Sequence, residues 1–211
     1  MKIVVGLGNP GQQYQNTRHN VGFDLLDELR RVFCGDPPRK KFDAQVSEIT
    51  VGQQRVLLVA PQTYMNNSGF SVQKAVAFYQ TPPHDLLVAC DDFSLSLGRI
   101  RVRPSGSSGG QKGLDSTIRH LGTQDFPRLR IGIGPVPSGR QAADFVLGKF
   151  SKDEQAVVQT MLNQAVFAVE EWLNFGVASA MNRFNADPSG QKPEDTPKQP
   201  RNPPSQDQTP Q

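Results

Sequence analysis

The sequence predicts an α/β domain, and two apolar runs carry most of that prediction. Residues 2–5 form a β-branched run that Gly6 stops, and residues 86–90 form a continuous apolar run typical of a strand covered on both faces. Polar residues follow each run, as they do where α/β sheets bind ligands, at the carboxyl ends of strands. With 211 residues and 36% apolar content, the chain is long enough for one domain with its own core.

The loop after the first strand is the strongest candidate for an active site. Gly8, Pro10 and Gly11 predict a sharp turn just beyond the strand. The loop is also dense in hydrogen-bonding side chains, namely Asn9, Tyr14, Asn16, Arg18, His19 and Asn20. A plain connection needs no such density.

The same loop allows a second interpretation, a dinucleotide site. Gly6, Gly8 and Gly11 match the pattern G-x-G-x-x-G, and Asp27 and Glu28 lie near the spacing of a ribose-binding acid. Such a site needs a helix that begins inside the glycine motif. Pro10 and the polar residues after it delay the helical pattern to about Val21, which disfavours this alternative.

The next segments predict a helix and two strands. Apolar residues recur at helical spacing from Val21 to Phe33, with Asn20 as the expected N-cap. Strands are expected at residues 44–51 and 55–60, joined by a short turn, and the basic residues 39–41 before them are interpreted as solvated surface.

Two further groups of polar residues follow strands. Residues 61–69 contain Asn66 and Asn67, which either belong to the site or cap the next helix. Asp91 and Asp92 end the buried run of residues 86–90. We therefore expect three strands to release polar residues at one edge of the sheet.

Basic charge is concentrated in one third of the chain. Residues 99–152 carry ten Lys and Arg against three Asp and Glu, whereas residues 1–98 are balanced at nine of each. This asymmetry favours a polyanionic partner over a surface that is basic by chance. Arg99, Arg101 and Arg103 alternate on a predicted strand, where they either meet phosphates or protect a sheet edge.

The last third predicts a loop, a strand, a long helix and a tail. The glycine-rich residues 105–110 are expected to cover the N-terminus of a helix, and residues 129–133 form a strand. Ser151 and Glu154 match a capping box before a helix with Trp172 in its core face. Residues 187–211 include seven Pro and no large apolar residue, which predicts a disordered tail after a domain of residues 1–186.

The compartment is predicted from what the sequence does and does not contain. Cys34 and Cys90 match no metal-ligand spacing and are expected to be free thiols in a reducing compartment. The chain starts directly with a strand, and no apolar run approaches a membrane span. These features predict a soluble, cytoplasmic protein with no metal site.

Several motifs together resemble one known family, the bacterial peptidyl-tRNA hydrolases. The motifs are VGLGNPG, TRHN with His19, TYMNNSG with Asn66, Asp91-Asp92, SGGQKGL and LRIGIGP, and the resemblance covers essentially residues 1–185. It implies a single α/β domain with a twisted, mixed and mostly parallel sheet and helices on both faces. It also implies a monomer without cofactor that hydrolyses the ester between a peptide and the 3′ end of tRNA.

The residue chemistry suits that reaction. Attack of water on an ester needs a base that can exchange a proton near neutral pH, as an imidazole can. His19 is the only histidine in a motif loop. Asp91 is expected to orient the imidazole, and Asn66 and Asn9 to stabilise the oxyanion and position the water. Direct water attack is preferred because no serine or cysteine lies in a nucleophile elbow.

Other roles follow from the resemblance alone. Asn9 and Tyr14 would hold the peptide, and Tyr64 and Met65 would contact the substrate, Met65 by packing against the terminal nucleotide. Arg103 and Arg130 would clamp the 5′ phosphate, with Arg101 as a further basic contact.

The glycine-rich loop departs from the family pattern. Where the family has His-Asn, this chain has Gln111-Lys112, and Lys112 is expected to contact the acceptor stem or the ribose end as a cation. A different class of function is also open, that of a non-catalytic RNA-binding relative such as the chloroplast intron-splicing proteins. The presence of Asn9, His19, Asn66 and Asp91 argues against it.

Overall fold

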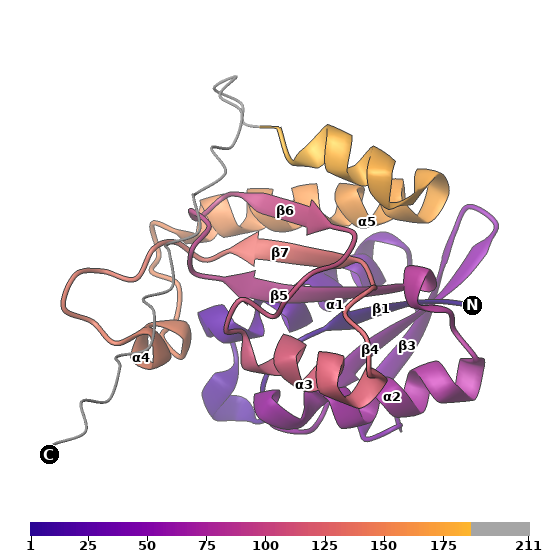
Figure 1. Cartoon of the computed structure of the whole chain (residues 1–211). Helices are drawn as coiled ribbons and strands as arrows, with labels where there is room; N and C mark the ends of the chain where they lie inside the picture. The colour runs from indigo at the N-terminus through magenta and orange to yellow at the C-terminus, as the bar shows by residue number, and fades with distance from the viewer. Residues whose placement is uncertain (187–211) are drawn as a thin grey trace, which may run out of the picture.

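A seven-stranded mixed sheet forms the centre of the computed structural model, which describes residues 1–186 (Figure 1). The strand order is β2-β3-β4-β1-β5-β7-β6, in which β1, β4, β5 and β7 run parallel and the β2–β3, β3–β4 and β6–β7 pairs are antiparallel. The strands are β1 Lys2–Gly6, β2 Arg39–Lys41, β3 Ala44–Val51, β4 Gln54–Pro61, β5 Leu86–Asp92, β6 Ile100–Arg103 and β7 Arg128–Gly132. The predicted mixed, mostly parallel sheet is confirmed.

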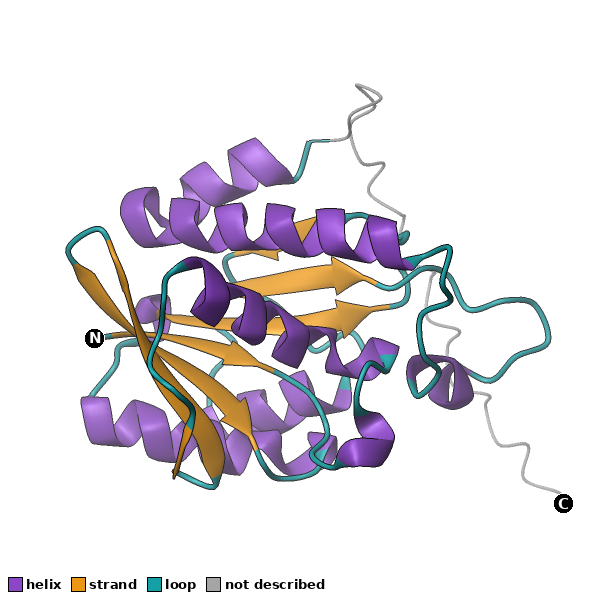
Figure 2. Ribbon diagram, turned by 180° about the vertical axis from the view of Figure 1, so that it is seen from behind, coloured by secondary structure: helices purple, strands orange, loops and turns teal. Residues whose placement is uncertain are grey.

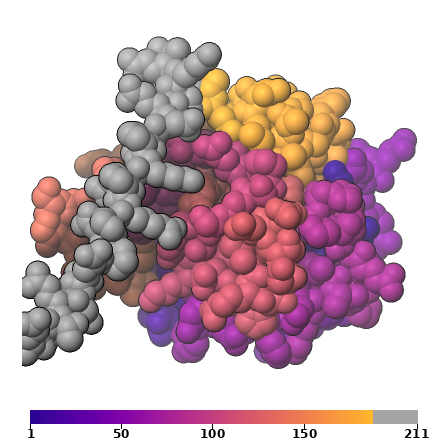
Figure 3. Space-filling model, viewed as in Figure 1, coloured from indigo at the N-terminus to yellow at the C-terminus, as the bar shows by residue number. Residues whose placement is uncertain are grey.

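Helices cover both faces of this sheet, as expected (Figures 1 and 2). The α-helices are α1 Val21–Val32, α2 Ser68–Tyr79, α3 Lys112–Leu121, α4 Ala142–Val146 and α5 Gln155–Phe184. Short 3-10 helices are η1 Gln12–Tyr14, η2 Arg18–Asn20, η3 Met65–Asn67 and η4 Pro83–Asp85. α1 and α5 pack on one face, and α2 and α3 pack on the other, where α3 lies at the surface seen in Figure 3. The tail predicted for residues 187–211 lies outside the described residues.

Alternation along the central strands explains why they are apolar throughout. In β5, Leu87 and Ala89 pack towards α1 and α5, while Leu86, Val88 and Cys90 pack towards α2 and α3. Successive side chains point to opposite faces, so a strand covered by helices on both sides must be apolar at every position. Trp172 of α5 is buried in the core, as predicted.

The glycines of the first loop serve helix packing rather than nucleotide binding. A Cβ on Gly6 would lie 2.1 Å from the Gly22 carbonyl oxygen, so α1 approaches β1 as closely as two backbones allow. α1 begins only at Val21, after η1 and η2, and its N-terminus is therefore not inside the glycine motif. The dinucleotide alternative was wrong.

Arg39 and Lys40 are exposed, as expected for solvated surface, and residues Arg39–Lys41 also form an edge strand in which Arg39 pairs with Val46 of β3. One local expectation was wrong. The long helix begins at Gln155, not directly after Ser151. Only half of the capping box forms, because Glu154 accepts a hydrogen bond from the Ser151 backbone N–H at 2.7 Å while the helix has no side-chain cap.

Candidate active site

Three parallel strands deliver polar residues to a cavity at the carboxyl edge of the sheet. The register places Val5 of β1 beside Val59 of β4 and Val88 of β5, so the segments after these strands meet at one edge. The cavity has a volume of about 350 Å³, and its polar lining includes Asn9, His19, Asn66, Asp91, Gln111 and Lys112. The expected convergence of three separate loops is confirmed.

An imidazole and a carboxylate form the centre of this cavity. η2 carries His19 and the end of β5 carries Asp91, and His19 Nδ1 lies 2.9 Å from Asp91 Oδ2. Asp91 is 3% exposed and the His19 side chain 12%, so their contact lies away from bulk solvent. Because a carboxylate accepts the Nδ1 proton, the Nε2 atom of the neutral ring is left as an acceptor. This is the arrangement that a general base needs.

Asn9 is held so that its amide group can donate. Its Oδ1 accepts a hydrogen bond from the Met65 backbone N–H at 2.8 Å, and Asn9 is 8% exposed. Its backbone N–H and carbonyl both bond to the Asn20 side chain, at 2.8 and 2.9 Å. With Oδ1 occupied, Nδ2 is the free donor of a fixed carboxamide on the cavity wall.

These contacts correct the role expected for Asn20. It does occupy the N-cap position of α1, but its side chain makes no capping hydrogen bond. Instead, it closes a two-bond clamp on the Asn9 backbone. Asn20 is therefore a residue that shapes the first loop.

Asn66 also lines the cavity, but unlike Asn9 its side chain is not held by hydrogen bonds in the described part of the chain. It lies in η3, is exposed, and makes no side-chain hydrogen bond within residues 1–186. The alternative of helix capping is not what the structure shows, since Asn67 holds the N-cap position of α2 without a side-chain bond. Asn66 is free to bond to a ligand.

Gln111 is a site residue that sequence reasoning did not find. Its Nε2 donates to Asp91 Oδ1 at 3.0 Å, and its Oε1 accepts from the Leu114 N–H at 2.7 Å as the N-cap of α3. Asp91 is thus held from both sides, by His19 and by Gln111. The position of Gln111 just before a predicted helix was a signal for a cap, but not for this contact.

The basic residues divide into two groups. Lys112 lines the cavity, and so does Arg130, whose guanidinium pairs with Asp92 at 3.1 Å and donates to the Ser107 and Ser108 carbonyls. Arg101 and Arg103 lie outside the cavity on β6, which is an edge strand of the described sheet. Asp92 therefore pairs with Arg130 rather than with His19.

Buried Arg128 also shapes the glycine-rich loop. It lies opposite Arg103 in the β6–β7 register and donates to backbone carbonyls that include those of Gly106 and Gln124. Loop 105–110 thereby reaches the N-terminus of α3, as predicted, and it is held there by arginines of β7. Sequence reasoning had not assigned Arg128 a role.

The remaining predicted substrate contacts differ in placement. Met65 is buried on the cavity wall, and Tyr64 lines the cavity with 62% of its surface exposed. Tyr14, in η1, is half-buried and does not line this cavity. Arg18, next to His19, pairs with Glu154 at 2.8 Å and lies between the rings of Phe145 and Phe150.

Within residues 1–186, no cluster of three or more His, Cys, Asp or Glu side chains could bind a metal ion. Cys34 and Cys90 are free thiols in this part of the chain. No helix in it is both long enough and apolar enough to span a bilayer.

Comparison with known proteins identifies the family. A polar cavity at the carboxyl edge of a mostly parallel sheet is typical of an α/β enzyme. The family described as peptidyl-tRNA hydrolase matches residues 3–194. The chain belongs to the peptidyl-tRNA hydrolase family, and it is a hydrolase.

Similar proteins and solved structures support this assignment over nearly the whole chain. The peptidyl-tRNA hydrolase of Rhodopirellula baltica is 51% identical over 186 residues, which cover 88% of this chain and 98% of that protein. That of Clostridium novyi is 42% identical with the same coverage. The crystal structure of peptidyl-tRNA hydrolase from Acinetobacter baumannii has a TM-score of 0.82 at 35% identity, covering 88% of this chain and 95% of that one.

Proposed function

We propose that this chain hydrolyses the ester bond between a peptide, or an N-blocked aminoacyl group, and the 3′ end of tRNA, and so releases free tRNA. The observation that carries the proposal is the His19–Asp91 pair at 2.9 Å in a cavity that the fixed Asn9 carboxamide also lines. It acts as a monomer in the cytoplasm, in keeping with the family's substrate.

The reaction proceeds by attack of water. His19 Nε2 accepts a proton as the water oxygen bonds to the ester carbonyl carbon, and Asp91 stabilises the resulting imidazolium. The oxyanion accepts hydrogen bonds from Asn9 Nδ2 and Asn66 Nδ2. The carbon–oxygen bond to the ribose then breaks, and the imidazolium returns its proton to the leaving ribose oxygen.

Gln111 supports the carboxylate rather than the substrate. With its Oε1 fixed by the Leu114 N–H, its Nε2 is directed at Asp91 Oδ1. A second hydrogen bond to Asp91 restricts rotation of the carboxylate and keeps Oδ2 on the imidazole. The glutamine thus fills the loop position at which this chain departs from the family pattern.

The tRNA is held through its phosphates. Lys112 contacts the acceptor end beside the cavity, and Arg103 and Arg101 on β6 extend the basic surface away from it. Arg130 takes part by holding loop 105–110 in place, because its guanidinium is engaged with Asp92 and loop carbonyls. Phosphate contacts of this kind position a substrate without reading its sequence.

Fewer residues are proposed to contact the terminal nucleotide and the peptide of the substrate. Tyr64 and Met65 pack against the terminal nucleotide and the first peptide residue, since both line the cavity. Tyr14 contacts the peptide from outside the cavity, on the loop that Asn20 shapes.

A release assay tests this function directly. Purified protein is incubated with N-acetyl-aminoacyl-tRNA, and free tRNA and free N-acetyl amino acid are measured over many turnovers. We expect stoichiometric release of both products. Binding of the tRNA without turnover would instead support the non-catalytic RNA-binding alternative and would overturn the proposal.

A further inference from the structure

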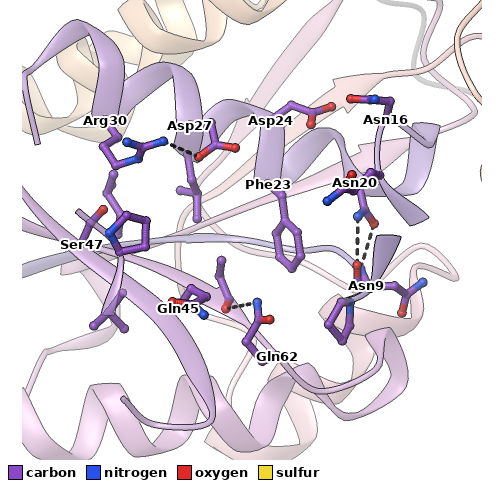
Figure 4. Close-up of a pocket in the computed structure, with 18 residues that line it drawn as sticks. Asn9, Asn16, Asn20, Phe23, Asp24, Asp27, Arg30, Gln45, Ser47 and Gln62 are labelled. Atoms are coloured by element: carbon purple, nitrogen blue, oxygen red, sulfur yellow. Dashed lines mark hydrogen bonds and ion pairs between the residues drawn. The ribbon is translucent and has the colours of Figure 1, made fainter. Parts of the chain in front are cut away.

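A second cavity, of about 540 Å³, lies beside α1 and shares only Asn9 with the active-site cavity (Figure 4). α1 contributes Phe23, Asp24 and Leu26 to its wall, and β3 and β4 contribute residues such as Gln45, Ser47 and Leu58. Its volume falls within the range of about 300–1,000 Å³ that ligand sites occupy. Apart from Asn9 and Asn20, none of the residues that line it has a role assigned above.

The sequence of β3 changes character where it faces this cavity. Ile49 and Val51, on the face covered by α1, are apolar and belong to the core. On the same face, the alternate positions Gln45 and Ser47 are polar, and both line the cavity. The strand is thus built for core packing at one end and for polar contacts at the other.

Four polar side chains of the cavity have no partner in the described part of the protein. Within residues 1–186, the side chains of Asn16, Asp24, Gln45 and Ser47 make no hydrogen bond, although Ser47 is only 6% exposed. Gln62 donates to the Ala60 carbonyl at 3.2 Å, which leaves its Oε1 as an acceptor. These four side chains around one cavity are therefore available to a ligand that offers hydrogen-bond partners.

The charges disfavour a phosphate ligand. Arg30 is the cationic side chain among the residues that line the cavity, and it pairs with Asp27 at 3.2 Å. The remaining charge is that of Asp24, whose pKa is raised to about 7 by burial and by the nearby Asp27 and Glu28. A carboxyl group in this state can donate or accept a hydrogen bond near neutral pH.

The arrangement of these groups suits an extended chain. Figure 4 shows Asn16 and Asp24 at one end of the cavity and Ser47 and Arg30 at the other, with Phe23 between them. Carboxamides can both donate to and accept from peptide groups, while Phe23, Leu26 and Leu58 offer apolar surface to side chains. Peptide groups recur in every peptide, so such contacts do not depend on sequence.

We propose that this cavity is a second subsite for the peptide of the substrate, which binds residues beyond the one esterified to tRNA. The inference rests on the proposed function. The two cavities meet at Asn9, whose side chain serves the active site and whose backbone is clamped by Asn20, a residue of the second cavity. In this proposal the peptide that extends from the ester passes Asn9, the residue that lines both cavities, towards Asp24 and Gln45.

The test compares substrates of two lengths on one tRNA, N-acetyl-aminoacyl-tRNA and N-acetyl-pentapeptidyl-tRNA. The variant Gln45→Ala removes a side chain that has no partner in the protein, so it breaks no internal hydrogen bond. The matched control is Gln53→Ala, in the exposed turn between β3 and β4 and outside both cavities. A third variant, Ser47→Leu, fills the cavity, and its melting temperature shows whether it folds.

We expect Gln45→Ala to lower kcat/KM for the pentapeptidyl substrate by about 3- to 10-fold, as for one lost hydrogen bond. The same variant should change kcat/KM for the one-residue substrate by less than about twofold, and Gln53→Ala should change neither value. Folded Ser47→Leu should show a larger loss that is again confined to the long substrate.

Two results would overturn the proposed subsite, and a third would overturn the proposed function on which it rests. An unchanged kcat/KM for the pentapeptidyl substrate in Gln45→Ala, or an equal loss on both substrates, would exclude the cavity as a peptide subsite. Failure of the wild-type protein to hydrolyse either substrate would instead overturn the proposed function, and the subsite with it.

Discussion

Replacement of Asp24 by Asn should stabilise the protein at alkaline pH and not at acid pH. Asp24 carries an unpartnered carboxyl group in the wall of the second cavity, and burial followed by repulsion from Asp27 and Glu28 raises its pKa from 3.8 to about 7. The folded state therefore binds the Asp24 proton more tightly than the unfolded state does. Ionisation of this group above neutral pH opposes folding.

The sign and the size of the effect follow from these two pKa values. Below pH 3.8 the carboxyl is protonated in both states, so it has no effect on stability; the destabilisation grows as the pH rises from 3.8 and is complete above about 7. Each unit of pKa difference corresponds to about 1.4 kcal/mol, so the rise from 3.8 to about 7 lowers the free energy of unfolding by at most about 4 kcal/mol. Relaxation and water entering the open cavity will reduce it to about 1–3 kcal/mol.

Urea unfolding at pH 4 and pH 8 measures this difference. Asp24→Asn should match the wild type in free energy of unfolding at pH 4 and exceed it by at least about 1 kcal/mol at pH 8. Asp125→Asn, at an exposed position, is the control and should show no such dependence on pH. A gain for Asp24→Asn that is equal at both pH values, or a loss at pH 8, would refute the reasoning.

Three further substitutions test the proposed contacts with substrate. Asn66→Ala should lower kcat by about 10² to 10³ in the release assay if its amide donates to the oxyanion, and a drop below about fivefold would remove it from that role. Arg103→Ala should raise KM with little change in kcat, because a phosphate contact far from the ester binds substrate and transition state equally; an unchanged KM at physiological salt would count against it. Lys112→Asn should weaken tRNA binding and flatten its salt dependence, and identical binding curves over a salt titration would exclude the contact.

The parts of the site that could be predicted are those fixed by strand ends. Asp91 follows a continuous apolar run, and His19 and Asn9 follow another, so a parallel sheet brings them to one edge. Their proximity therefore follows from topology, and a pattern of apolar runs is enough to suggest it. The distance of 2.9 Å between His19 and Asp91 needed the folded chain.

The parts that could not be predicted depend on long-range contacts of side chains with several possible partners. Asn20 matched a local capping pattern, yet its partner is the backbone of Asn9 on the preceding loop. Gln111 contacts Asp91 across the sheet edge, and nothing in its neighbours along the chain points there. Residues Arg39–Lys41 lacked the apolar alternation that signals a strand, because an edge strand exposed to solvent does not need it.

The cavity beside α1 escaped prediction for a similar reason. In the sequence, Gln45 and Ser47 fit the pattern of an ordinary strand with one polar, half-exposed face. Only the folded chain shows that α1 and the loop of Asn9 enclose this face, and that Asp24 reaches it from a helix.

The most direct test of the account is the turnover of His19→Ala beside that of the wild type on N-acetyl-aminoacyl-tRNA. Asp91 contacts the ring of His19, and Gln111 in turn donates a hydrogen bond to Asp91. We expect the variant to lose at least about 100-fold in kcat while it still binds the tRNA, as when a general base is removed. Wild-type turnover by His19→Ala would contradict the assignment of the base and the mechanism built on it.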